Sequence, residues 1–352
     1  MKYLFKILIL LFGTLSFSQE LIFENLFDSS LSSEIACYRI PSIITSTNGT
    51  LIAAIDERNN SCGDLKWNKN INIVLRKSYD DGKTWTKIER IIDYPIGESA
   101  SDPSMIVDRQ TKDIFLFYNY MNLDKAKDIY RFMVIKSNDN GESWSSPKDI
   151  TDQITKKEWK NDFMFITSGR GIQSEDGILL HCLVNLNKGT HVFGSNDHGK
   201  NWFLIDYPLK PGDESKIIEL SNGDWLVNSR VNLNKFRYSH ISKDKGKSWL
   251  SFENKDLSDP ACNASIINYN ISSEKLLLFS NAFDSNERKN LSLSISYDQG
   301  MSWKNNKTIY KGSSAYSSMT KLKNGDVGLF FEKDNYTKNV FVRVPKKWVL
   351  DK

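Results

Sequence analysis

The sequence has little of what marks several common classes of protein. Its 352 residues carry 47 basic and 43 acidic side chains, so the formal net charge is only +4. A charge this small gives no reason to expect nucleic acid or a membrane surface as a partner. The four cysteines and four histidines form no close Cys-x-x-Cys or similar metal-binding pattern, so we expect no metal and no cofactor. Helical periodicity is almost absent, and residues 155–159 are the only short helix expected.

A short apolar run lies near the N-terminus. Residues 7–12 are apolar, follow two lysines and precede small residues suited to a signal peptidase. These features predict a secretory signal peptide over residues 1–18, since the run is short of the ~20 residues that a membrane span requires. No other segment is apolar enough to cross a bilayer, and no linker divides the rest. We therefore expect a secreted or periplasmic monomer whose mature chain, residues 19–352, is one domain.

A short pattern occurs five times along the chain. It reads Ser-x-Asp-x-Gly-x-x-Trp, and its copies start at Ser78, Ser137, Ser195, Ser242 and Ser296. An aspartate can accept hydrogen bonds from backbone N–H groups ahead of it, glycine adopts left-handed conformations, and the tryptophan can pack back as the next strand begins. The pattern is therefore typical of a hairpin turn. Each copy has one fixed carboxylate, which is too few oxygen ligands for a dedicated calcium site.

Strand-like segments lie before and between these turns. They include residues 71–75, 132–135 and 291–295 before a turn, and residues 113–118, 177–180, 224–227, 275–279 and 327–331 between turns. About four strands for every ~50–60 residues is the spacing of a β-propeller blade. The sequence thus predicts an all-β fold, a six-bladed β-propeller. Its five turns are the Ser-x-Asp-x-Gly-x-x-Trp repeats, which we call Asp-box turns. The sixth blade lacks the pattern and should combine strands from both ends of the chain.

One arginine lies in an apolar stretch near the start of the mature chain. Arg39 stands in the run Tyr-Arg-Ile-Pro-Ser, which two isoleucines continue. Burying a guanidinium is costly unless an anion meets it. A lone arginine in this setting would more often lie on an edge strand beside the proline. The residues that follow along the chain favour the buried, anion-binding alternative.

Together, the five turns and the Arg-Ile-Pro motif resemble the bacterial sialidases, or exo-α-neuraminidases, which carry both on a six-bladed propeller. The resemblance covers essentially the whole mature chain. It implies hydrolysis of terminal sialic acids on glycans and glycoproteins, with retention through a tyrosyl-enzyme intermediate. Sialic acid carries a carboxylate, which three guanidiniums can hold by charged, bidentate contacts. The resemblance assigns this role to Arg39, Arg230 and Arg288, with Arg237 as an alternative to Arg288, and assigns Glu332 to orient Arg39.

The resemblance also implies residues around the glycosidic bond. Arg58 matches an arginine that contacts substrate hydroxyls, and Asp64, on the loop that follows, matches the acid/base catalyst. A carboxyl that protonates a leaving oxygen needs a raised pKa, which a loop that excludes water could supply. Asp56 is the alternative acid, although it stands on the strand rather than the loop. Asp102, in Ser-Asp-Pro-Ser, matches an aspartate that binds a ring hydroxyl.

The expected nucleophile is a tyrosine rather than a carboxylate. An anion attacking a carbon that already bears a carboxylate would be repelled, whereas a neutral phenol is not. A phenol is a weak nucleophile and needs an adjacent base. The resemblance assigns Tyr316 as the nucleophile and Glu214 as its base, with Glu219 as the alternative base.

Some features leave alternatives open. A sialoglycan-binding propeller without catalysis would be expected to lack one of the three catalytic residues, and a glycosidase for another nonulosonic acid would differ only around the sugar's C5. Met121, Trp67 and Phe163 are candidates for contact with the acylamino group there. Among the three pairings that four cysteines allow, we favour Cys37 with Cys62, because these two flank residues assigned to one site.

Overall fold

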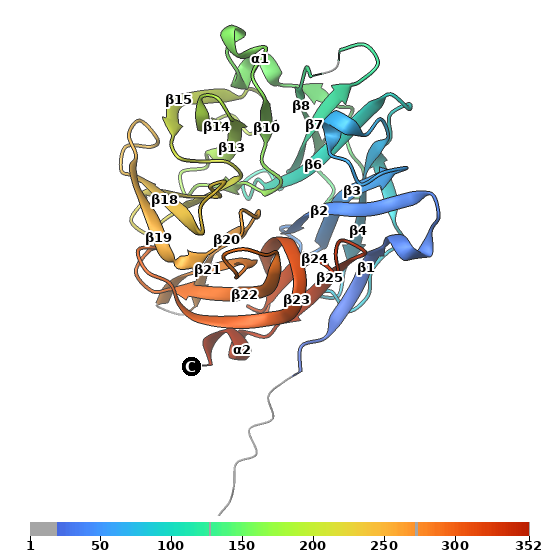
Figure 1. The fold of residues 1–352 in the computed structure, drawn as a ribbon. Helices are drawn as coiled ribbons and strands as arrows, with labels where there is room; N and C mark the ends of the chain where they lie inside the picture. Colours follow the sequence, from blue (N-terminus) through green and yellow to red (C-terminus); the bar gives the residue numbers. More distant parts are fainter. Residues whose placement is uncertain (1–19, 127, 272–273, 352) are drawn as a thin grey trace, which may run out of the picture.

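The computed structural model describes residues 20–126, 128–271 and 274–351 as an all-β protein. Its sheets lie side by side around a ring in a propeller-like arrangement, and the chain passes round the ring in sequence order (Figure 1). Most strands of each sheet therefore come from one stretch of chain, as repeats of one hairpin pattern require. The predicted signal peptide, residues 1–18, lies outside the described residues.

Four smaller sheets and one large one make up the described fold. The first contains β2 (Ile35–Thr45), β3 (Leu51–Asn59), β4 (Ile71–Ser78) and β5 (Glu89–Ile92). The second contains β11 (Gly169–Arg170), β6 (Glu98–Val107), β7 (Ile114–Asn122), β8 (Arg131–Ser137) and β9 (Lys148–Asp149). The third contains β10 (Met164–Ile166), β12 (Ile172–Gln173), β13 (Leu179–Asn185), β14 (Gly189–Ser195) and β15 (Phe203–Leu209). The fourth contains β16 (Ser215–Glu219), β17 (Trp225–Ser229), β18 (Phe236–Ser242) and β19 (Leu250–Ser258).

The large sheet joins the two ends of the chain. In order, it contains β1 (Phe23–Asp28), β25 (Lys338–Val344), β24 (Val327–Lys333), β23 (Lys304–Lys321), β22 (Lys289–Ser296), β21 (Glu274–Ala282) and β20 (Ser265–Ile271). Its long strand β23 pairs with β22 as far as Ser313 and with β24 from Ser314 onward. At the outer edge, β1 pairs antiparallel with β25. The prediction that both termini supply strands to the last sheet is confirmed, and this pairing closes the ring.

All five repeats form the predicted turns. In each, the serine hydroxyl donates to the aspartate and accepts from the glycine N–H, while the aspartate accepts from the N–H two residues past the glycine. The five glycines have φ between 76° and 88°, in the left-handed region. The residue before each glycine is left-handed as well, which the pattern did not reveal because its identity varies.

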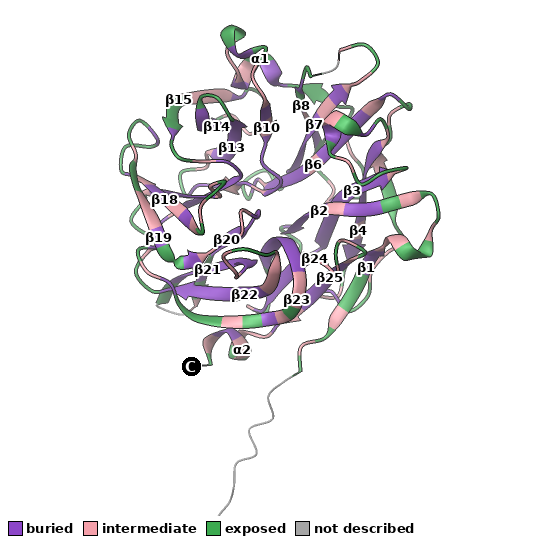
Figure 2. Cartoon of the chain, viewed as in Figure 1, coloured by how far each residue is buried: buried purple, intermediate pink, exposed green. Residues whose placement is uncertain are grey.

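The core lies between neighbouring sheets, where the turn tryptophans pack. Trp202 of the third repeat lies edge-on to Phe117 on β7 and Phe193 on β14, with ring centroids 5.0 and 5.9 Å apart. Trp85 of the first repeat meets Phe341 on β25 at 5.1 Å. Buried residues dominate the strands toward the middle of the ring, and exposed ones gather on the outer strands and loops (Figure 2).

Helix is scarce, as expected, but its position was predicted only in part. The described chain has two short α-helices, α1 (Thr151–Ile154) and α2 (Lys346–Leu350), and 3₁₀ turns at Ser29–Leu31, Leu65–Trp67 and Lys157–Trp159. The expected helix over 155–159 is thus a 3₁₀ turn with α1 before it. Helices of four or five residues are too short to show a helical period in sequence. No helix in the described ranges combines the length and the hydropathy needed to cross a bilayer.

Candidate active site

The inner strands bring the predicted residues to one end of the ring. Strand β2 contacts both β6 and β23, and β16 contacts β20, so these strands surround the centre. The residues come from strands and from the loops beside them: Arg39 on β2, Arg58 on β3, Asp64 after β3, Asp102 on β6, Glu214 before β16, Arg230 after β17, Arg288 before β22, Tyr316 on β23 and Glu332 on β24. These residues belong to four of the five sheets, and the third sheet contributes none of them.

A buried carboxylate anchors the first arginine. Glu332 is fully buried, and its Oε1 accepts from Arg39 Nε at 2.6 Å and from the Ile40 backbone N–H at 2.9 Å. Its Oε2 accepts from the Tyr316 backbone N–H at 3.0 Å. One side chain therefore fixes the guanidinium and also the strand that carries the tyrosine. The pairing with Glu332 offsets the cost of burying Arg39 before any anion arrives.

β-Bulges lie next to two of the predicted site residues, Arg39 and Asp102. The β2–β3 register shifts between Arg39 and Ser42, where Ile40 has φ 69°. The β6–β7 register shifts in the same way around Asp102, which has φ 64°. In both places a proline follows, and a bulge tolerates proline because the residue need not donate to the ladder. A left-handed conformation at a β-branched residue such as Ile40 is strained, as is common at functional sites.

One contact group contains the predicted nucleophile, its predicted base and the second predicted arginine. The Tyr316 hydroxyl donates to Glu214 Oε2 at 2.8 Å, and Arg230 Nη1 donates to the same oxygen at 2.6 Å. The Arg230 Nη1 also lies 3.2 Å from the phenol oxygen. Burial and the charge of Glu214 raise the pKa of Tyr316 well above its usual value, so the phenol is neutral. Glu219, the alternative base, lies apart from this group at the far end of β16, where it accepts from the Glu175 N–H.

Arg288, rather than the alternative Arg237, lies beside Tyr316. Its guanidinium lies 5.4 Å from the centre of the Tyr316 ring, against 5.5 Å for that of Arg39. Arg237 is fully buried, and it donates to Asn228, Asp259 and the Cys262 carbonyl. It therefore ties strands and loops together within the core.

Tyr336 belongs to the same cluster and was missed by sequence reasoning. The Arg39 guanidinium carbon lies 4.1 Å from its ring centre, and Arg288 Nη1 donates to its hydroxyl at 3.3 Å. It is the third of three consecutive left-handed residues in the β24–β25 turn, with φ 70°. Tyr336 thus spaces two arginines of the cluster. A tyrosine in a polar turn gives no sequence signal for this role.

The proposed acid lies on an exposed loop beside Arg58. The Asp64 side chain is 66% exposed, and its Oδ1 accepts from Arg58 Nη1 at 2.7 Å. Partial burial acts to raise its pKa, but the charge and hydrogen bond of Arg58 outweigh that effect, so the pKa of Asp64 lies below its usual value. The raised pKa expected from sequence is therefore wrong for the unliganded protein, because a fixed cation contacts the carboxylate and water still reaches it.

Asp56, the alternative acid, is fully buried behind Arg58. It accepts from Arg58 Nε and Nη2 at 3.1 and 2.9 Å and from the Ser101 hydroxyl at 2.6 Å. The Asp102 backbone N–H donates to its second oxygen at 2.9 Å, and Asn119 donates to the Asp102 carboxylate at 2.8 Å. Burial and the neighbouring charge of Asp56 raise the pKa of Asp102. Asp56 therefore orients Arg58, and Asp102 lies beside Asp56.

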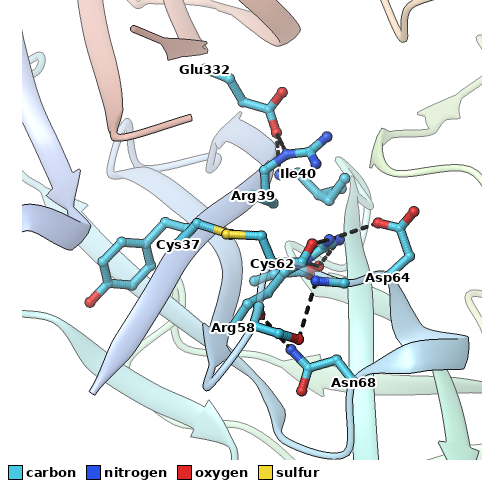
Figure 3. Close-up of a disulfide and its surroundings, with 12 residues drawn as sticks. Cys37, Arg39, Ile40, Arg58, Cys62, Asp64, Asn68 and Glu332 are labelled. Carbon is cyan, nitrogen blue, oxygen red and sulfur yellow. Dashed lines mark hydrogen bonds and ion pairs between the residues drawn. A yellow bond between two sulfur atoms is a disulfide. The ribbon is translucent and has the colours of Figure 1, made fainter. Parts of the chain in front are cut away.

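The remaining predicted features have mixed outcomes. Cys37 and Cys62 form a disulfide, as favoured from sequence (Figure 3). Met121 is fully buried in the core and cannot contact a bound sugar, so that candidate was wrong. Phe163 packs against the Tyr130 ring at 5.0 Å. The Trp67 side chain is exposed in the 3₁₀ turn just after Asp64.

Comparisons with known proteins identify the family. Residues 49–329 match the family model described as a BNR repeat-like domain. A sialidase of Bacteroides fragilis is 29% identical over 84% of this chain, and one of Micromonospora viridifaciens is 32% identical over 84%. The chain belongs to the sialidase family with BNR repeats. It spans 60% and 50% of the lengths of these two sialidases.

Solved structures in the sialidase family share the fold. A Hadza microbial sialidase superposes with a TM-score of 0.80 at 26% identity, over 88% of this chain and 66% of that one. An intramolecular trans-sialidase from Ruminococcus gnavus superposes with a TM-score of 0.82 at 19% identity, over 93% of this chain and 98% of that one. The second likeness shows the fold alone.

Proposed function

We propose that this protein is an exo-α-sialidase that removes terminal sialic acids from glycans and glycoproteins with retention of configuration. The contact of Tyr316 with Glu214 and Arg230, flanked by Arg39 and Arg288, is the observation that carries this proposal. A paired phenol and carboxylate beneath three guanidiniums suits a substrate whose reacting carbon bears a carboxylate. The names of the related sialidases support the same assignment.

In the first step, the three arginines hold the substrate carboxylate, and the anomeric carbon lies over the Tyr316 hydroxyl. Glu214 Oε2 takes the phenolic proton as the tyrosine oxygen attacks that carbon. The bond to the aglycone oxygen breaks, and Asp64 supplies the proton that this oxygen needs to leave as an alcohol. The products of this step are the free aglycone and a sugar bonded to Tyr316.

In the second step, water replaces the aglycone. The Asp64 carboxylate, now without its proton, takes one from the water as the water oxygen attacks the anomeric carbon. The tyrosine leaves and recovers its proton from Glu214. Two inversions give net retention. We propose that Asp102 binds a sugar hydroxyl on this side. Arg58, predicted to do the same, is fully buried and its Nη1 donates to Asp64, so a sugar hydroxyl would have to displace that carboxylate to reach it.

The same proposal covers the finer fold and the location. Divided at the Ser313–Ser314 junction of β23, the large sheet supplies two blades, and with the four smaller sheets these make six. We propose that residues 19–352 form this single propeller domain as a monomer, secreted or periplasmic, after removal of the signal peptide. The lysines and apolar run of residues 1–18 support export.

The direct test measures release of sialic acid from sialyllactose and of umbelliferone from its sialoside. The proposal predicts release from both by the wild-type protein and by Glu219→Gln, a carboxylate variant at the far end of β16. Binding of sialyllactose without release would instead indicate a lectin-like propeller. Release only from a deaminated analogue would indicate a different nonulosonic acid as substrate.

The pH dependence is expected to follow Asp64. Partial burial raises its pKa, but the charge and hydrogen bond of Arg58 more than offset this, so the acid loses its proton readily in the free protein. Because kcat/KM reports the free enzyme, kcat/KM for sialyllactose should fall as the pH rises from about 5 to about 8. Asp64→Asn should remove this decline. A wild-type kcat/KM that rises over that range would contradict the assignment of the acid.

Tyr336 is expected to act on binding more than on chemistry. Tyr336→Leu removes both the ring under Arg39 and the hydroxyl that Arg288 contacts, so KM for sialyllactose should rise about 10-fold. The kcat should change by less than about 3-fold, because the pairing of Tyr316 with its base is untouched. Tyr336→Phe, which keeps the ring, is the matched control and should raise KM less. Equal KM in all three proteins would refute the positioning role.

A further inference from the structure

The strand that carries Arg39 and the loop that carries Asp64 are joined covalently. Cys37 lies on β2 two residues before Arg39, and Cys62 lies two residues before Asp64. Their disulfide links positions 25 residues apart in sequence, with Cα atoms 5.6 Å apart. Figure 3 shows this bond between the Arg39–Glu332 pair and the Arg58–Asp64 pair. The bridge therefore stands between the residue that binds the carboxylate and the proposed acid.

Besides the disulfide, hydrogen bonds from Arg58 on β3 hold the loop at Cys62 and Asp64. Residues 60–62 and Asp64 are exposed, and the first buried side chain that follows is Leu65. Asn68 donates to the Ser61 carbonyl at 2.8 Å, and its own carbonyl accepts from the Ser99 hydroxyl on β6 at 2.7 Å, so the sheet holds the loop again only after the acid. The Cys62 side chain thus supplies the covalent attachment of this exposed stretch to β2.

Arg58 contacts this loop through one nitrogen, Nη1. Its Nη1 donates to the Cys62 carbonyl at 3.0 Å and to Asp64 Oδ1 at 2.7 Å. Its Nε and Nη2 are held from behind by the buried Asp56. The guanidinium is therefore fixed, and the disulfide keeps both the carbonyl and the acid within its reach. If Cys62 moves, the same displacement carries Asp64 away.

We infer that the Cys37–Cys62 disulfide positions Asp64 for proton transfer to the leaving oxygen, and that its reduction impairs acid catalysis selectively. This inference rests on the proposed sialidase function. A dithiol reductant is oxidised to its disulfide, and the two cysteines each gain a hydrogen and become thiols. The exposure of Cys62 leaves the bond open to such a reagent.

Leaving-group chemistry separates this role from a merely structural one. The alcohol released from sialyllactose is a poor leaving group and needs a proton in the transition state, whereas umbelliferone leaves as a stable anion. General acid catalysis contributes ~10²–10⁴-fold where it is needed. A displaced Asp64 should therefore slow sialyllactose cleavage by about 10–100-fold and umbelliferyl sialoside cleavage by less than about 3-fold. General loosening of the site would slow both alike.

The experiment compares the wild-type protein, oxidised and after treatment with dithiothreitol, with the double variant Cys37→Ser/Cys62→Ser. Asp64→Asn provides the pattern expected when acid catalysis is lost. The inference predicts that the reduced wild type and the double variant share that pattern, and that the reductant changes nothing further in the double variant. The free energy of unfolding, measured alongside, checks that all samples are folded under the assay conditions.

Three results would overturn the inference. Unchanged kcat for sialyllactose after reduction would show that Asp64 is positioned without the disulfide. An equal loss for both substrates would assign the bridge to overall integrity of the site. Failure of the oxidised wild type to release either product would refute the proposed function, and the inference with it.

Discussion

Tyr316→Phe is expected to lower kcat for a sialoside by on the order of 10³-fold or more, because it removes the nucleophilic oxygen and leaves nothing for Glu214 to deprotonate. The ring stays in place, so the arginines at 5.4 and 5.5 Å from its centre keep their packing. KM should therefore change by less than about 5-fold. Steady-state kinetics with the umbelliferyl sialoside measures both constants.

The matched control is Tyr336→Phe, which removes the other phenol oxygen of the cluster. Its kcat should stay within about 3-fold of the wild type, since Tyr336 touches arginines but not Glu214. A loss of less than about 10-fold in Tyr316→Phe would mean that this hydroxyl does not carry the reaction.

Glu332→Ala is expected to have the largest effect on stability, lowering the free energy of unfolding by about 3–5 kcal/mol. The glutamate is fully buried and accepts hydrogen bonds from Arg39, Ile40 and Tyr316. Its loss leaves the Arg39 guanidinium, whose side chain is 11% exposed, without a counter-charge. Urea unfolding followed by tryptophan fluorescence measures the change.

Glu332→Gln and Glu219→Ala provide controls for this value. The glutamine keeps the shape of the side chain but not its charge. The free energy of unfolding of Glu332→Gln should therefore lie between those of the wild type and Glu332→Ala. Glu219→Ala removes a half-buried carboxylate at the opposite end of the inner strands and should cost less than about 1 kcal/mol. A similarly small cost for Glu332→Ala would show that Arg39 does not depend on this partner.

Most of the architecture could be predicted because it repeats. Each turn fixes its own conformation through a serine, an aspartate and a glycine a few residues apart, so local chemistry determines it. The joining of the termini also followed, since the sixth unit lacked the pattern. Helices α1 and α2 could not be predicted, because four or five residues show no helical period.

Parts of the site could likewise be predicted from sequence, and other parts could not. Tyr316 and Glu214 were assigned by resemblance to a family. The fold places the Tyr316 hydroxyl 2.8 Å from Glu214 Oε2. The state of Asp64 was not predictable, because its pKa depends on whether Arg58 reaches it through space. The contribution of Tyr336 depends on left-handed turn geometry, which an ordinary loop sequence does not reveal. Relationships within one turn were accessible from the local sequence, whereas those between sheets were predicted only where the family resemblance supplied them.

The central claim is a covalent bond between the sugar and Tyr316. A sialosyl fluoride with a second fluorine next to the anomeric carbon should trap this species, because fluoride leaves readily while the neighbouring fluorine slows the attack by water. Mass spectrometry of the intact protein and of its peptides then locates the sugar. The account predicts one added sugar on the peptide that contains Tyr316, and none on the Tyr316→Phe protein. An adduct on Glu214, or none at all on an enzyme that turns over sialosides, would contradict it.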